Sequence, residues 1–172
     1  MTRQEASSFY QAHSKAVYNT ALRILRDSAQ AEEVMQDTLL KYLSGGVKSA
    51  SDAQAAAWLR TTCVRKAIDR LRAIRRGPVF MDTALLPAED EPLDEPFDGT
   101  LPDILQIRTA METLPEPYRL ILDLTLIEGL GYDEIARMTR RKESTLRSIY
   151  ARGKARLAAK LRQLASADDT LI

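Results

Sequence analysis

A proline-rich acidic stretch between residues 77 and 107 is the feature that most restricts how this chain can fold. It holds five of the seven prolines and eight Asp and Glu residues, and it contains no Lys or Arg. Proline interrupts helices and sheets, and unbalanced charge opposes collapse. We therefore expect a flexible acidic linker over 77–107 that separates a first domain, residues 1–76, from a second, residues 108–172.

The formal charge of +1 hides a division along the chain. Residues 1–76 carry 13 basic and 7 acidic side chains, the linker carries 8 acidic ones, and residues 108–172 carry 12 basic and 9 acidic ones. The net charges are therefore +6, −8 and +3. Residues 139–162 alone hold nine basic residues and one acid, so positive charge gathers towards the end of the chain.

Composition and motifs exclude several classes of function. One His and one Cys, His13 and Cys63, cannot supply the four ligands of an all-Cys/His zinc site or form an internal disulfide. No nucleophile-elbow, zinc-protease or P-loop motif occurs, and no apolar run approaches the ~20 residues of a membrane span. We expect a cytoplasmic protein that does not insert into membranes, needs no cofactor or metal and carries out no hydrolytic or redox catalysis. His13 and Cys63 are expected only to fill helix faces.

Hydrophobic periodicity predicts three helices in the first domain. The first 43 residues contain neither Gly nor Pro, and apolar residues three and four apart indicate helices over 4–26 and 29–43. A third helix is expected over 53–75, with Asp52 as its N-cap and Trp58 in its buried stripe. The opposite side of this third helix is strongly basic.

The second domain is predicted to be helical as well. A lead-in helix over 103–113 precedes helices over 116–127, 132–138 and 143–164, and residues 113–116 match a capping box. A short basic turn joins the last two helices, which is the outline of a helix-turn-helix, although many helical hairpins share it. The whole chain is therefore expected to be all-α, with two small helical domains joined by the flexible linker.

The last predicted helix has two different sides. A stripe expected to face the core comprises Leu146, Ile149, Tyr150, Gly153, Leu157, Leu161 and Leu164. The other side carries the small residues Ser144, Ser148, Ala151, Ala155, Ala158 and Ala159, flanked by Arg147, Arg152 and Arg156. Small residues let a helix approach a DNA duplex, and arginines reach phosphates or guanine edges. A solvated helix, rich in alanine for its helix propensity, is the alternative.

Several segments, taken in order, resemble bacterial RNA polymerase sigma factors of the extracytoplasmic-function (ECF) type. The segment AEEVMQDTLLK, residues 31–41, resembles the family's core-polymerase-binding helix. The segments AWL and AIDRLR, residues 57–59 and 67–72, resemble its −10-melting and −10-reading helix. The segments LPEPYR (114–119) and GLGYDEIA (129–136) resemble region 4.1 of the family. The segments ESTLRS (143–148) and RGKARL (152–157) resemble region 4.2, which reads the −35 element.

The resemblance implies a bridge between polymerase and promoter rather than an enzyme. Its expected partners are the clamp helices of the largest polymerase subunit, the flap of the second-largest subunit, promoter DNA and an anti-sigma factor. The polymerase-binding residues it implies are Glu33, Met35, Gln36, Asp37, Leu40 and Lys41. The alternative at these positions is that Met35 and Leu40 are buried in the core and the carboxylates are merely solvated.

The resemblance also implies two sets of DNA contacts. The set expected at the −10 element comprises Lys48, Ser49 and Ser51, in a loop that captures a flipped base, and Arg60, Arg65, Lys66, Arg72, Arg75 and Arg76. The set expected at the −35 element comprises Arg140, Arg141, Lys142, Ser144, Thr145, Arg147, Ser148, Arg152 and Arg156. The acidic linker is expected to follow the RNA-exit path of the polymerase.

The turn before the last helix departs from the family pattern. Gly, an apolar residue and Ser usually stand where this chain has Arg140, Arg141 and Lys142. A left-handed backbone at Arg140 costs about 1–2 kcal/mol, so the resemblance does not fix the geometry of this turn.

Two other classes of function stay open at this point. A stand-alone helix-turn-helix regulator binds duplex DNA tightly without polymerase, usually as a dimer; the divided architecture and the polymerase-binding segment argue against it. A decoy binds polymerase or an anti-sigma factor but reads no promoter, so its last helix does not influence transcription.

Overall fold

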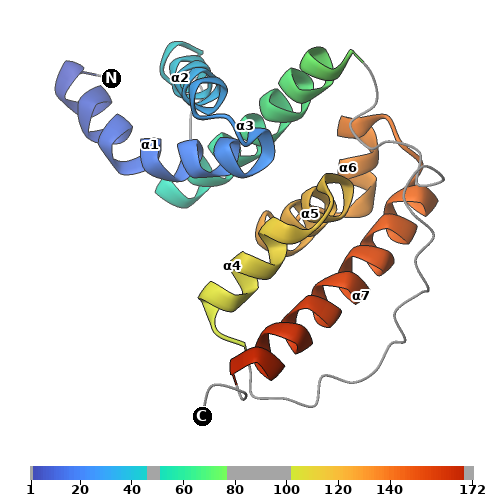
Figure 1. Cartoon of the computed structure of the whole chain (residues 1–172). Helices are drawn as coiled ribbons and strands as arrows, with labels where there is room; N and C mark the ends of the chain where they lie inside the picture. The colour runs from blue at the N-terminus through green and yellow to red at the C-terminus, as the bar shows by residue number, and fades with distance from the viewer. Residues whose placement is uncertain (1, 46–50, 77–101, 169–172) are drawn as a thin grey trace. The chain divides into compact units, whose positions relative to one another are not determined.

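The computed structural model describes residues 2–45, 51–76 and 102–168, and these fall into two compact units (Figure 1). One unit lies within Met1–Val79 and the other within Phe80–Ile172. Every regular element in the described ranges is helical, which confirms the all-α class. Of the predicted linker, residues 77–101 lie outside the described residues, whereas its last residues already begin a helix.

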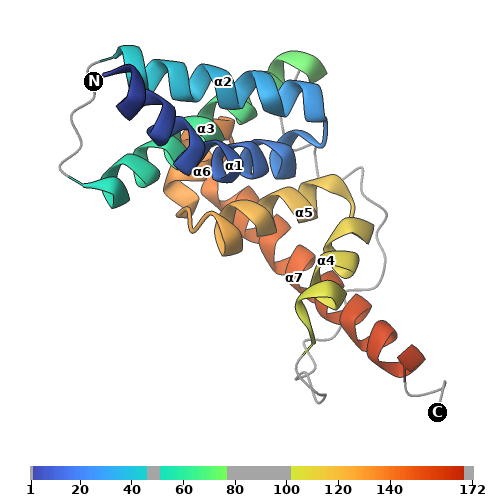
Figure 2. The same ribbon diagram turned by 90° about the vertical axis from the view of Figure 1, so that its left-hand side faces the viewer.

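The first unit is a bundle of three helices that pack against one another (Figures 1 and 2). They are α1 (Arg3–Leu25), α2 (Ser28–Ser44) and α3 (Asp52–Arg75), close to the predicted bounds. Asp27 caps α2 by accepting a hydrogen bond from the backbone N–H of Gln30. The predicted cap of α3 is wrong by one residue, because Ser51, not Asp52, accepts the bond from the N–H of Gln54.

Small and branched side chains fill the core of the first unit. Cys63 is fully buried, and its thiol lies 3.4 Å from the carbonyl oxygen of Val17, so it fills a helix face as expected. Trp58 is only half-buried and meets Tyr42 edge-on, with ring centroids 5.5 Å apart, so its predicted place in the core is only partly correct. The core comprises Val17, Ala21, Ile24, Leu25, Ala31, Val34, Met35, Leu39, Tyr42, Ala55, Leu59, Cys63, Val64, Ala67, Ile68 and Leu71.

The second unit is also helical, and its longest helix packs against α4, α5 and α6 (Figure 1). Its elements are α4 (Ile104–Thr113), α5 (Glu116–Leu122), a π-helical turn η2 (Asp123–Ile127), α6 (Tyr132–Thr139) and α7 (Glu143–Asp168). The predicted helix over 116–127 is therefore an α-helix that widens into a π turn. The predicted capping box is wrong, because Thr113 still belongs to α4 and its hydroxyl donates to the carbonyl of Ala110.

A buried ion pair lies where α5 passes into the π turn. The guanidinium of Arg119 donates to a carboxylate oxygen of Asp123 at 3.0 Å, and each side chain is only 6% exposed. Three leucine and isoleucine residues between them, Leu120, Ile121 and Leu122, are fully buried. Replacing only one partner of such a pair leaves an uncompensated charge in the core, which destabilises the fold, so a change at one residue requires a change at the other.

Gly153 lets α7 approach α5 closely. A Cβ at this position would lie 3.2 Å from the Cβ of Tyr118 and 3.4 Å from its Cα and carbonyl oxygen. The Tyr118 ring is buried, and the guanidinium of Arg156 lies over it, 5.0 Å from its centroid. The distance between α5 and α7 is therefore set by the missing side chain at Gly153.

Replacement of Gly153 by leucine is expected to lower the free energy of unfolding by about 2 kcal/mol, because the backbone of α5 leaves no room for the side chain. Alanine is expected to cost less, since it needs a shift of a few tenths of an ångström and gains about 1 kcal/mol in helix propensity. Urea denaturation of the whole chain measures both. Lys154→Ala, exposed on the same helix, is the control; a Gly153→Leu variant as stable as that control contradicts the close packing.

Candidate nucleic-acid and polymerase interfaces

The turn between α6 and α7 forms around a residue with left-handed backbone. Arg140 has φ 56° and ψ 38°, and its N–H donates to the carbonyl of Ala136 at the end of α6. The N–H of Arg141 donates to the same carbonyl at 3.3 Å. Arg140 therefore has the left-handed conformation whose cost is about 1–2 kcal/mol. Its side chain is exposed, beside the start of α7.

The first half of α7 has the two sides expected from the sequence. Leu146, Ile149 and Gly153 are buried, and Tyr150 is half-buried beside them. The opposite side exposes three small residues and two arginines, and we call this set the small-residue strip: Ser144, Arg147, Ser148, Ala151 and Arg152.

The second half of α7 departs from the expectation. Ala155, Ala158 and Ala159 are half-buried rather than exposed. Both α4 and α5 pack along α7, so its buried sector is wider than one apolar stripe. Arg156 is half-buried over Tyr118 and does not flank an exposed strip. The exposed small residues therefore end near residue 152.

Arg147 is held at the edge of the small-residue strip by contacts with both helices of the motif. Its guanidinium donates to the Glu143 carboxylate at 3.2 Å and lies 5.4 Å from the centroid of the Tyr132 ring on α6. The Tyr132 ring in turn meets Tyr150 edge-on at 5.9 Å. Burial raises the pKa of the Tyr132 phenol, and the nearby Arg147 guanidinium acts against this shift.

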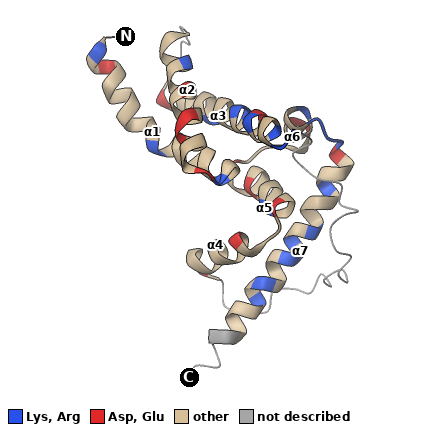
Figure 3. Ribbon diagram, turned by 45° about the horizontal axis from the view of Figure 1, so that its top comes forward, with Lys and Arg blue, Asp and Glu red and all other residues tan. Residues whose placement is uncertain are grey.

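In the first unit, two ion pairs join α2 to α3, and we call them the α2–α3 ion pairs. The Arg70 guanidinium pairs with Glu33, and the Lys66 ammonium lies 3.2 Å from a carboxylate oxygen of Asp37. Figure 3 shows acidic residues on α2 and basic residues on α3. All four side chains are at least partly exposed, so each pair is expected to stabilise the unit by only about 0–1 kcal/mol.

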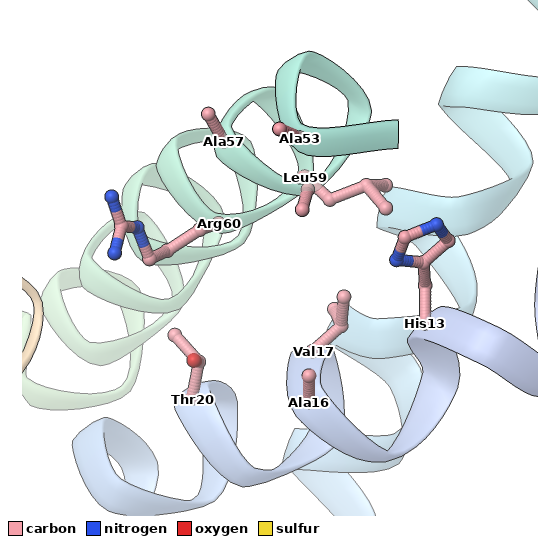
Figure 4. A pocket seen from close by; sticks show the side chains of 9 residues that line it. His13, Ala16, Val17, Thr20, Ala53, Ala57, Leu59 and Arg60 are labelled. Carbon is pink, nitrogen blue, oxygen red and sulfur yellow. The ribbon is translucent and has the colours of Figure 1, made fainter. Parts of the chain in front are cut away.

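A groove of about 380 Å³ lies between α1 and the start of α3 (Figure 4). Most of its wall is apolar and small, with one imidazole, one hydroxyl and one guanidinium: His13, Ala16, Val17, Thr20, Ala53, Ala56, Ala57, Leu59 and Arg60. In the described ranges no cluster of His, Cys, Asp and Glu could hold a metal ion. None of the described helices is long and apolar enough to cross a membrane.

Comparison with known proteins places both units in one family. The family described as Sigma-70 region 2 matches residues 9–77, and the family described as Sigma-70, region 4 matches residues 104–157. The ECF RNA polymerase sigma factor SigK of Mycobacterium tuberculosis is 27% identical over 151 residues, which cover 83% of this chain and 78% of SigK. The chain belongs to the ECF sigma factors of the sigma-70 family.

Two further proteins are similar over most of this sigma factor. The ECF RNA polymerase sigma factor SigM of Mycobacterium tuberculosis is 25% identical over 156 residues, which cover 91% of this chain and 76% of SigM. The sigma factor RpoE of Bartonella quintana, solved in complex with the anti-sigma factor NepR, matches with a TM-score of 0.51 and 21% identity. That match covers 92% of this chain and 98% of the other, and it supports the fold.

The residues expected at the −35 element gather around the turn and the first half of α7, but not all are exposed. The region 4 match, residues 104–157, covers α6 and the first part of α7. Three members of the set, Arg141, Thr145 and Arg156, are half-buried. The six exposed members are Arg140, Lys142, Ser144, Arg147, Ser148 and Arg152.

The residues expected at the −10 element lie on α3 and just before it. Lys48 and Ser49 lie outside the described residues, and Ser51 caps α3. The exposed arginines of this set are Arg60, Arg65 and Arg76, whereas Lys66, Arg72 and Arg75 are half-buried. Two of the half-buried cations pair with carboxylates, Lys66 with Asp37 and Arg72 with Asp69.

The expected polymerase-binding residues divide in the same way. Leu40 is 62% exposed, which argues against its placement in the core. Met35 is 6% exposed and packs inside the bundle, so the alternative of a core residue holds there and Met35 offers almost no surface to a partner. The remaining members, Glu33, Gln36, Asp37 and Lys41, are exposed on α2.

Sequence reasoning missed the residues that link helices. Arg70 was left out of every candidate set, although it pairs with Glu33 on α2. Arg70 lies four residues from Lys66, as Glu33 lies four residues from Asp37. The sequence does not show which turns of α2 and α3 meet, because the packing of the two helices decides this. His13 was expected only to fill a helix face. Instead it also links two helices, because its Nε2 lies 3.0 Å from a carboxylate oxygen of Asp52.

Replacement of Arg140 by glycine is expected to raise the free energy of unfolding by up to about 1 kcal/mol. Glycine removes left-handed strain of about 1–2 kcal/mol and adds about 0.5–1 kcal/mol of chain entropy to the unfolded state. Urea denaturation of the whole chain measures the change. Arg140→Ala removes the same charge but keeps the Cβ, so it is expected to bring no gain. Equal stability of the two variants contradicts a strained turn.

Proposed function

We propose that this ECF sigma factor binds core RNA polymerase and directs it to specific promoters, where it reads both promoter elements and assists DNA melting. The observation that carries this proposal is the exposed small-residue strip of α7, placed at the end of a helix-turn-helix and beside a basic turn. Within the chain we assign region 2 to residues 1–76 and region 4 to residues 108–172, joined by the acidic linker 77–107.

At the −35 element, α7 enters the major groove with its small-residue strip against the DNA. Ser144, Ser148 and Ala151 let the helix backbone come close, while Arg147 and Arg152 reach phosphates or guanine edges from the two margins. Arg140 and Lys142 bring positive charge to the start of α7, where the free N–H groups of a helix already favour phosphate.

At the −10 element, the exposed cations of α3 bind the phosphates of the melted strand and of the duplex upstream. Arg60 and Arg65 lie on the exposed surface of this helix, and Ser51 precedes it. Extruding a base from the stack costs a few kcal/mol, which contacts around the flipped base must offset. Each phosphate that these cations neutralise steepens the log–log dependence of binding on salt by about 0.7–0.9.

The surface of α2 that binds polymerase comprises Glu33, Gln36, Asp37, Leu40 and Lys41, and we propose the clamp helices of the largest subunit as its partner. The exposed Leu40 gives this polar surface an apolar centre, as protein interfaces commonly have. The second domain contacts the flap of the second-largest subunit. The sigma factor RpoE binds the anti-sigma factor NepR, which supports an anti-sigma partner here too. With these partners the protein acts in the bacterial cytoplasm.

Run-off transcription with core polymerase and genomic fragments tests the proposal. We expect the chain to produce defined start sites that core polymerase alone does not produce. No stimulation at any fragment contradicts it. Tight, specific binding of the isolated chain to duplex DNA favours a stand-alone regulator instead, and polymerase binding without initiation favours a decoy.

Replacement of Arg152 by alanine is expected to reduce initiation and to lower the salt slope of promoter binding by about 0.9 if the contact is to a phosphate. If the contact is to guanine, it is expected to cost about 1–3 kcal/mol of discrimination at one base pair. Filter binding of the holoenzyme at several salt concentrations separates the two. The matched control is Arg156→Ala, which removes a cation from the same helix but one that stacks on Tyr118; an equal loss from both variants contradicts the assignment of the strip.

Replacement of Leu40 by alanine is expected to weaken the binding of core polymerase about 5- to 30-fold, which corresponds to a loss of about 1–2 kcal/mol. Because Leu40 is exposed, the free energy of unfolding is expected to change by less than about 0.5 kcal/mol. Its neighbour Leu39 is buried, so Leu39→Ala is expected to cost about 2–5 kcal/mol of stability. Fluorescence titration and urea denaturation measure the two effects, and unchanged affinity of Leu40→Ala for polymerase contradicts the proposed surface.

A further inference from the structure

His13 is the one histidine of the chain, and it makes a directed contact between helices that are distant in sequence. Its side chain lies on α1 and is 9% exposed, with its ring centroid 4.4 Å from that of Phe9. Its Nε2 lies 3.0 Å from a carboxylate oxygen of Asp52, the first residue of α3. Since an ionised carboxylate only accepts, Nε2 carries the hydrogen of this bond.

The start of α3 has thin apolar packing on the side that faces α1. Ala53, Ala56 and Ala57 line the groove there with side chains too short to fill it, and all three are exposed (Figure 4). Apolar contact resumes deeper in the bundle, at the buried Ala55 and Leu59. The hydrogen bond from His13 is therefore a directed contact to the first residue of α3, beside a groove that the alanine side chains leave open.

The contact acts on a residue next to a proposed DNA contact. Ser51 precedes Asp52 directly, and its hydroxyl is occupied as the cap of α3, accepting from the N–H of Gln54 at 3.3 Å. A restraint on Asp52 therefore acts directly beside Ser51, at the first turn of α3. Asp52 itself is 84% exposed, so its side chain adds little to the core.

We propose that His13 is a positioning residue for promoter opening: acting through Asp52, it holds Ser51 and the start of α3 in place against the −10 element. This inference rests on the proposed function of the first domain. His13 touches no DNA in this role, because its side chain is buried between the helices.

The proposal requires a hydrogen-bond donor at position 13 and an acceptor at position 52. His13→Leu and Asp52→Ala each remove the bond, and each is expected to reduce the fraction of open promoter about two- to tenfold, the range for the loss of one typical hydrogen bond. His13→Gln restores a donor and is expected to stay within about twofold of the native chain. The double variant His13→Leu with Asp52→Ala is expected to be no worse than either single variant, since both act through one bond.

The experiment uses the full chain with core polymerase on a promoter found by run-off transcription, and it measures permanganate reactivity of unpaired thymines at the −10 element. Core-polymerase affinity and urea denaturation are measured on the same variants, with Lys15→Ala, exposed on α1, as the control. Reduced opening with unchanged polymerase affinity supports the positioning role, above all when glutamine rescues it.

Two results overturn the inference. The first is that Asp52→Ala opens the promoter as well as the native chain does. This result overturns the inference for any behaviour of His13→Leu, because Asp52 is exposed and its loss leaves the core intact. A parallel loss of opening, polymerase affinity and stability also does so, since it assigns His13 a structural role only. If the native chain itself initiates at no promoter, the result contradicts the proposed function rather than this inference. Measuring the native chain beside the variants separates the two failures.

Discussion

Burial of one apolar sector on each helix is the constraint on which this structure depends. In α3 the sector includes Leu59 and Ile68, and in α7 it includes Leu146 and Ile149. Successive helical residues are turned by a fixed angle, so burying one sector decides which residues face outward. The basic surface of α3 and the small-residue strip of α7 are thus consequences of the cores that the two units form separately.

The fold could be predicted largely from the sequence because its helices carry local signals. Gly and Pro mark their ends, and three-and-four spacing of apolar residues marks their buried sides. The errors fell where a competing local interaction existed. Ser51 rather than Asp52 caps α3, and Thr113 bonds back to Ala110 instead of capping α5. The π turn after α5 has no sequence signal of comparable strength.

The candidate site was predictable only in part, because exposure depends on neighbours that are remote in sequence. Periodicity along α7 identified its first half correctly, whereas Ala155 and Arg156 were misjudged because the docking of α4 and α5 widens the buried sector. Family resemblance brought Met35 into the polymerase-binding set, although its side chain points into the bundle. The bond between His13 and Asp52 joins residues 39 positions apart and could come only from the packing of α1 on α3.

The α2–α3 ion pairs connect the two proposed surfaces of the first unit, because each pair joins an acid on the proposed polymerase-binding side to a base on the proposed DNA-binding side. Under the proposed function, a polymerase cation that binds Glu33 or Asp37 would release Arg70 or Lys66 for a phosphate. Reciprocally, DNA phosphates that bind the two cations would release the two carboxylates. An exposed pair is worth about 0.2–1 kcal/mol, so each exchange couples the two equilibria by about 1.4- to 5-fold. Under the proposed function, this surface would favour binding polymerase and DNA together over binding either one alone.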